Sequence, residues 1–126
     1  MTTWFARAVL HVRDVAASQR FYIDQLAFTH AWSYDEDGAP AVAQVERDGC
    51  ALILSNQWPD KVGKALMFVS LDAGSPAAMT AALDELRAEL ASRGVAVKDA
   101  NWGYRVLAVE DPDGNTLYFN YPNEPA

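Results

Sequence analysis

Few side chains in this sequence are of the types that carry acid–base or nucleophilic chemistry. There are two histidines, His11 and His30, and one cysteine, Cys50. Cys50 begins a strand-like apolar run, which is typical of a core residue rather than a nucleophile. His11 is the better catalytic candidate because it shares a strand face with Arg7, although a lone histidine more often has a structural role. The carboxylates fall in predicted turns and caps, so we expect no catalytic residues.

Aromatic side chains point instead to ligand binding. Trp102 and Tyr104 flank Gly103 in a predicted loop, where a core position is less common than in a strand. Rings of this kind bind flat, largely apolar molecules, and the faces of Trp and Tyr also attract cations. Phe68 alternates with Leu66 in a predicted strand, so its ring can equally belong to the core.

The charge balance argues against some partners. The sequence has 10 Lys and Arg against 17 Asp and Glu, a formal net charge of −7. This argues against nucleic acid, whose phosphates need a basic surface. It favours a cationic ligand through long-range attraction, but acidity also serves solubility, and the sequence leaves both interpretations open. Arg7, if it points into a cleft, must face solvent, pair with an acid or meet an anionic ligand.

The length of 126 residues fits one domain spanning 1–126, large enough for a core without disulfides or metal. No apolar run approaches the ~20 residues that span a bilayer. The first residues also do not resemble a signal peptide. We therefore expect a soluble, cytoplasmic protein that does not bind membranes.

The predicted elements of the first half follow the order strand, helix and three strands. The first strand covers 5–12, and alternation puts Arg7, Val9 and His11 on its mixed face. Asp14 caps a helix over 15–26. Strands follow at 28–34, 41–46 and 50–55, the last two joined by an Asp-Gly hairpin turn. On the 28–34 strand we expect His30 and Trp32 on one face.

The same order repeats after a polar linker, which divides the chain into halves of about 1–58 and 64–126. A strand is predicted over 65–71. Ser75 and Pro76 begin a helix that Gly94 ends, and its apolar residues recur every three to four positions. Strands at 95–98, 105–110 and 116–121 complete this half. Two βαβββ modules can pair their curved sheets around a shared cleft, which is an α+β fold.

Two stretches resemble the vicinal oxygen chelate superfamily, which includes glyoxalases, bleomycin-resistance proteins and dioxygenases. The first runs from Val12-Arg-Asp-Val15 through Ser18-Gln-Arg-Phe-Tyr22 to Leu26-Ala-Phe28, with Ala27 where the family usually has Gly. The second comprises Trp102-Gly-Tyr-Arg105, Glu110-Asp-Pro-Asp-Gly-Asn115 and Leu117-Tyr-Phe119. This second stretch is most similar to the bleomycin-resistance branch. The resemblance covers nearly the whole chain and is more specific for the superfamily than for one activity.

The resemblance implies a homodimer, with clefts that both chains often complete. In the family's enzymes four cleft-facing positions bind a metal ion, and they fall here on Arg7, Ile53, Leu66 and Tyr118. Two of these side chains have no donor atom, and a guanidinium repels a cation, so we expect neither metal nor other cofactor. A one-residue slip in the middle strands brings only Leu52, Leu54, Ala65 or Met67 into place.

The resemblance also places several aromatic residues around the cleft. Together with Arg7 and His11, the predicted ligand-binding residues are Trp32, Trp58, Phe68, Trp102, Tyr104 and Tyr118. The favoured hypothesis is a metal-free protein that sequesters an aromatic ligand of the bleomycin kind, cationic in one version. One alternative is an enzyme with an atypical active site, either a metal-dependent lyase or dioxygenase with displaced ligands or a metal-free lyase using His11 and Arg7. Another is a domain that binds a metabolite for regulation.

Overall fold

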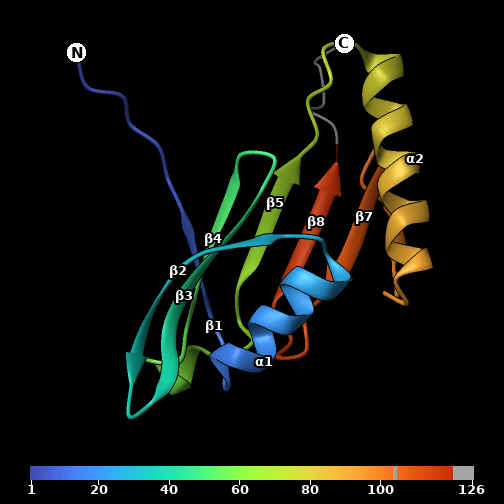
Figure 1. Cartoon of the computed structure of the whole chain (residues 1–126). Coiled ribbons are helices and arrows are strands. Elements are labelled where there is room, and N and C mark those ends of the chain that lie inside the picture. Colours follow the sequence, from blue (N-terminus) through green and yellow to red (C-terminus); the bar gives the residue numbers. More distant parts are fainter. Residues whose placement is uncertain (104, 121–126) are drawn as a thin grey trace.

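The computed structural model describes residues 1–103 and 105–120 and folds them into two four-stranded sheets and two longer helices (Figure 1). The N-terminal sheet has the order β1-β4-β3-β2, with β1 (Ala8–His11), β2 (Thr29–Glu36), β3 (Ala39–Arg47) and β4 (Cys50–Ser55). The C-terminal sheet has the order β5-β8-β7-β6, with β5 (Leu66–Ser70), β6 (Lys98–Asn101), β7 (Arg105–Glu110) and β8 (Thr116–Asn120). The parallel pairs are β1 with β4 and β5 with β8, and all other strand pairs are antiparallel. The shared topology confirms the predicted α+β fold of two βαβββ modules.

Each module contributes one longer helix with a side-chain N-cap. The helical segments are α1 (Val15–Arg20), its π-helical continuation η1 (Phe21–Gln25), the short 3-10 helix η2 (Pro59–Lys61) and α2 (Pro76–Ser92). Asp14 Oδ1 accepts the backbone N–H of Ala17 at 3.0 Å, and Ser75 Oγ accepts that of Ala78 at 3.2 Å. Both caps satisfy N–H groups that have no partner inside the helix, as the sequence predicts.

One hydrophobic core joins both sheets and both helices. The predicted apolar stripe of α2 is buried, at Met79, Leu83, Leu86 and Leu90. It packs in the same cluster as side chains of the two sheets, including Leu10, Val45, Leu54, Leu107, Leu117 and Phe119. We call the opposite side of each sheet its open face. The open faces carry large apolar side chains that are partly exposed, so they are the surfaces available for binding.

The chain before β1 differs from the prediction. The first strand begins at Ala8 rather than at residue 5, and residues 1–7 form an extended arm that projects away from both sheets beyond Arg7, which still contacts β3 (Figure 1). Ala8 pairs with Leu52, and β4 begins only two residues before Leu52, so the start of the arm has no strand beside it. Trp4 and Phe5 on this arm are 92% and 80% exposed.

Two predictions about strands are wrong, one for β2 and one for β6. A β-bulge interrupts β2, so His30 pairs with the core residue Val45 whereas Trp32 pairs with Gln44 on the open face. The two side chains therefore do not share a face. The strand predicted over 95–98 lies at Lys98–Asn101, because the residues just after α2 close the helix instead: the N–H of Val95 donates to the carbonyl of Leu90 at 3.0 Å.

Buried polar contacts fasten the two modules at one end. Tyr22 Oη donates to Asp111 Oδ2 at 3.0 Å, and Asn115 Nδ2 donates to the carbonyl of His11 at 3.1 Å. Burial raises the pKa of the Tyr22 phenol, and the nearby charge of Asp111 raises it further. Gly63 of the linker adds a backbone bond to the same carbonyl of His11 at 3.3 Å. The Asp-Pro-Asp-Gly-Asn turn is thus a structural joint, which we call the fixed end.

Candidate functional site

Three aromatic rings form a cluster on the open face of the C-terminal sheet. Phe68 and Tyr118 are register partners on β5 and β8, and their rings stack with centroids 5.3 Å apart. Trp102 lies against both, at 5.4 Å from Phe68 and 4.9 Å from Tyr118. A turn after β6 positions Trp102, because Asn101 Oδ1 accepts the N–H of Gly103 at 2.9 Å. Phe68 and Trp102 remain 44% and 48% exposed, so the cluster presents ring surface to solvent.

A second group forms around Gln44 on the open face of the N-terminal sheet. The Gln44 side chain is buried, and its Oε1 accepts Arg7 Nη1 at 2.9 Å and Trp32 Nε1 at 3.0 Å. Its Nε2 donates to Glu46 Oε1 at 2.7 Å. Three bonds therefore fix the amide. Arg7 is exposed to solvent, which is one of the three outcomes expected for it, and its hydrogen-bond partner is the neutral Gln44 rather than an acid.

His11 and Trp58 form a third, separate group. Their ring centroids are 6.1 Å apart in an edge-to-face arrangement, and Lys61 Nζ lies 5.0 Å from the Trp58 ring centroid. His11 Nδ1 is buried without a hydrogen-bond partner among the described residues. The Trp58 face is thus already covered by a cation of the protein itself.

A cleft of about 890 Å³ separates the two sheets near the start of β1. One wall includes Arg7, Cys50 and Leu52, and the other includes Phe68 and Phe119. Residues of α2 form the far side, and acidic side chains of the lining are Asp48, Asp72, Glu85 and Glu89. Its size is within the range of small-molecule sites, and Phe68 joins it to the aromatic cluster.

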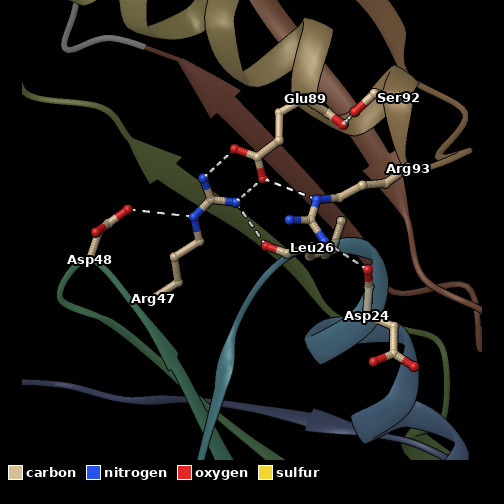
Figure 2. A network of polar contacts seen from close by, with 7 residues as sticks. All are labelled: Asp24, Leu26, Arg47, Asp48, Glu89, Ser92 and Arg93. Atoms are coloured by element: carbon tan, nitrogen blue, oxygen red, sulfur yellow. Dashed lines mark hydrogen bonds and ion pairs between the residues drawn. The ribbon is translucent and has the colours of Figure 1, made fainter.

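An ion-pair network bridges the two modules at the edge of this cleft (Figure 2). Arg47, the last residue of β3, makes two bonds of 2.8 Å to Glu89 of α2, and a third of 2.8 Å to the carbonyl of Leu26. Arg93 adds a longer contact to Glu89 and donates to the carbonyl of Asp24. Hydrogen bonds from Arg47 hold the pKa of Glu89 below its ordinary value. We call the Arg47–Glu89 pair the latch.

The four positions that bind metal in the family's enzymes lie in two pairs on different sheets. Ile53 pairs with Val9 in the N-terminal sheet, whereas Leu66 and Tyr118 belong to the C-terminal sheet, and of the four only Arg7 lines the cleft. Ile53 and Leu66 carry no donor atom. Within residues 1–103 and 105–120, no group of three or more His, Cys, Asp or Glu is placed to hold an ion. A metal of that type does not fit these residues.

The predicted ligand-binding residues therefore divide into separate groups. Phe68, Trp102 and Tyr118 come together, Arg7 and Trp32 meet at Gln44, and His11 and Trp58 lie apart from both. Tyr104 lies outside the described residues. The sequence analysis missed Gln44 and the latch. The alternation of Gln44 and Glu46 with Ala43 and Val45 was a usable signal for the first, whereas nothing local marked the second.

Comparisons with known proteins identify the family and the fold. A family model described as "Glyoxalase superfamily protein" matches residues 4–125. TnmS3, an antibiotic binding protein from Streptomyces sp. CB03234, is 24% identical, with 98% of this chain and 99% of that chain covered and a TM-score of 0.72. The bleomycin-binding protein from Streptomyces verticillus, complexed with copper(II)-bleomycin, is 24% identical, with 98% and 100% covered and a TM-score of 0.69.

A third solved structure, a glyoxalase/bleomycin resistance protein from Streptomyces sp. CB03234, is 25% identical, with 90% of this chain and 96% of that chain covered and a TM-score of 0.68. At these identities the structures show a shared fold. No curated protein matches the chain. Among the described residues, no helix has the length and apolar character needed to cross a membrane.

Proposed function

We propose that this chain, which belongs to the glyoxalase superfamily, binds a small aromatic molecule and does not transform it. The cluster of Phe68, Trp102 and Tyr118 carries this proposal, since two of its rings remain about half exposed beside a cleft of about 890 Å³. Touching rings that face solvent offer the flat apolar surface on which aromatic ligands stack. Two structures with the same fold are described as antibiotic-binding and bleomycin-binding proteins, which supports small-molecule binding here.

The proposed binding needs no metal ion. It is supported by the donor chemistry, because Ile53 and Leu66 cannot coordinate and Arg7 carries a positive charge. The net charge of −7 raises the concentration of cationic molecules near the surface, so the proposed aromatic ligands include those that also carry a cationic group. Elemental analysis of the purified protein tests whether binding is metal-free. A stoichiometric transition metal would contradict it.

A lyase or dioxygenase with an atypical active site is the alternative. It requires an acid–base group beside the bound ligand, and His11 was the best candidate for that role. His11 does not line the cleft, and its ring packs against Trp58. The geometry therefore supports binding better than catalysis by this residue.

We also propose that the protein acts in the cytoplasm as a homodimer. The open faces of one chain leave Val9, Tyr34 and Leu66 exposed at 44%, 58% and 60%. Apolar patches of this kind commonly mark a surface that another protein covers. Sedimentation equilibrium at several concentrations tests the dimer, and a single species of 13.8 kDa would refute it.

The binding proposal is tested with N-phenyl-1-naphthylamine, a neutral probe whose fluorescence rises in apolar surroundings. We expect saturable binding, and Trp102→Ala to weaken it about tenfold through the loss of stacking and buried area. Trp4→Ala is the matched control because Trp4 is exposed on the arm and is not part of the cluster. Unchanged affinity in Trp102→Ala would overturn the proposed site.

Bleomycin is the natural second ligand to test, by isothermal titration calorimetry. Binding at micromolar concentrations that Trp102→Ala weakens would support the drug-binding version of the proposal. Absence of heat with bleomycin, together with binding of the naphthyl probe, would refute only that version.

A further inference from the structure

We propose that Arg7, held in place by Gln44, binds an anionic group of the ligand, so that the ligand class is an aromatic compound bearing a carboxylate, sulfonate, phosphate or similar acid. This inference rests on the aromatic binding proposed above and adds the chemical group that accompanies the rings. It makes Arg7 a residue that determines specificity and Gln44 a positioning residue.

The first support is the way in which Gln44 is built into the sheet. Its side chain is 6% exposed, although it lies on the open face of β3. Burying an amide is unfavourable unless its polar atoms are bonded, and here Oε1 accepts from both Arg7 and Trp32. The bond from Gln44 Nε2 to Glu46 fixes which end of the amide faces Arg7. The amide therefore serves as a rigid support for the guanidinium.

The second support is the charge that Arg7 retains. Its hydrogen-bond partner is neutral, and no carboxylate of the described residues forms an ion pair with it. The other arginine of the cleft, Arg47, is bonded twice to Glu89. A guanidinium has five N–H donors in a planar fork that matches an anionic oxygen pair. Gln44 uses only part of that capacity, so Arg7 keeps donors for a ligand.

The third support is the position of Arg7 relative to the rings. Arg7, at the base of the arm, and Phe68, on β5, line the same cleft from the two modules, and their side chains reach the open faces, where they contact Gln44 and Tyr118. A molecule whose rings lie on the aromatic cluster can therefore extend an acidic group across the cleft to Arg7. The Arg7 guanidinium also lies 5.9 Å from the ring centroid of Phe5, another residue of the arm.

The acidic residues of the cleft repel an anionic ligand and therefore oppose its binding to Arg7. Asp48 and Glu89 are both paired with Arg47, which leaves Asp72 and Glu85 as lining acids without an ion pair among the described residues. Their repulsion is screened by salt over about 10 Å, whereas a charge-assisted hydrogen bond acts at contact. Contact with Arg7 therefore decides where the acid group binds, and the acidic lining lowers the affinity of anions that cannot reach it.

The test compares two fluorescent probes that differ by one acid group. The anion 8-anilinonaphthalene-1-sulfonate carries a sulfonate that the neutral N-phenyl-1-naphthylamine lacks. We expect the wild-type protein to bind the sulfonate about tenfold more tightly, as a charge-assisted hydrogen bond predicts. Arg7→Gln should abolish most of this preference and should weaken the neutral probe much less. Gln44→Leu should reduce the preference too, whereas Arg7→Lys should retain part of it.

Arg20→Gln is the matched control, because it makes the same change of charge at an exposed residue at the end of α1. It should leave the preference for the sulfonate unchanged. Equal affinity of the wild-type protein for both probes, or equal loss in Arg7→Gln and Arg20→Gln, would overturn the role of Arg7 while leaving aromatic binding intact. If neither probe binds, the aromatic binding itself is refuted, and the role of Arg7 falls with it.

Discussion

The latch allows a quantitative prediction, because Glu89→Gln removes its negative charge while keeping the shape of the side chain. One of the two 2.8 Å bonds from Arg47 then loses its ionic character and the other is lost, because an amide nitrogen cannot accept a hydrogen bond. The longer contact from Arg93 also weakens. The side chains of Arg47 and Glu89 are 26% and 31% exposed. Paired charges at the surface contribute ~0.2–1 kcal/mol, and the bidentate geometry and partial burial point to the upper end. We therefore expect a cost of about 1 kcal/mol, or a loss of about 3–6 °C in Tm.

The pH dependence of this effect has a definite sign. The pKa of Glu89 in the folded protein lies below its ordinary value of 4.5, chiefly because of the hydrogen bonds from Arg47. A lowered pKa contributes stability above the unfolded value, and this contribution is lost as the pH falls through the folded value. The difference between wild type and Glu89→Gln should thus be constant from neutral pH down to about 5 and should shrink below 4.5.

Urea denaturation at pH 7 and at pH 3.5 to 4, within about one unit of the ordinary glutamate value, measures both effects. Arg47→Met and the double variant complete a mutant cycle, whose coupling energy isolates the pair. Glu85→Gln is the matched control, because Glu85 is an exposed glutamate one helical turn earlier on α2. A free energy of unfolding for Glu89→Gln equal to that of Glu85→Gln, or no coupling in the cycle, would refute the reasoning.

Other parts of the structure give further predictions. Tyr22→Phe removes a donor from the buried carboxylate of Asp111 and should cost about 1.5–3 kcal/mol in chemical denaturation; less than about 0.5 kcal/mol would contradict the fixed end. Gly63→Ala should cost more than about 1 kcal/mol, because φ is +73° and the new Cβ would meet the carbonyl of Asp113; an unchanged Tm would contradict this. Burial raises the pKa of the Cys50 thiol, so it should react with a disulfide reagent at pH 8 more slowly than in urea, and equal rates would show that it is open to solvent.

Local patterns were sufficient to predict most elements, and the exceptions have a common cause. For α2, the Ser75 cap, Pro76 and the apolar stripe all act within the segment, so the sequence determines the helix by itself. For β6, Val95 and Val97 have strand propensity but pack against the core outside the strand. Edge strands depend on pairing with a neighbour, here β7, and no local pattern encodes that register.

The same distinction applies to the candidate site. The family resemblance placed Phe68 and Tyr118 around a cleft, and the parallel register of β5 and β8 brings their rings together. The bulge in β2 was not visible in the sequence, so His30 and Trp32 were wrongly assigned to one face. Gln44 illustrates the remaining difficulty. Its polar character was evident on β3, but its importance comes from two donors on other strands or the arm.

The two connections between the modules differ in a way that bears on ligand entry. At the fixed end, Asp111 is 4% exposed and Asn115 is 1% exposed, so water cannot readily replace their bonds. At the other end the latch is about a quarter to a third exposed, and water can solvate Arg47 and Glu89 once they separate. The latch residues line the cleft, so opening there widens access without disturbing the fixed end. Because local opening follows the least stable contacts, the cleft is expected to admit a ligand on the latch side, between the wall that includes Arg7 and the wall that includes Phe68.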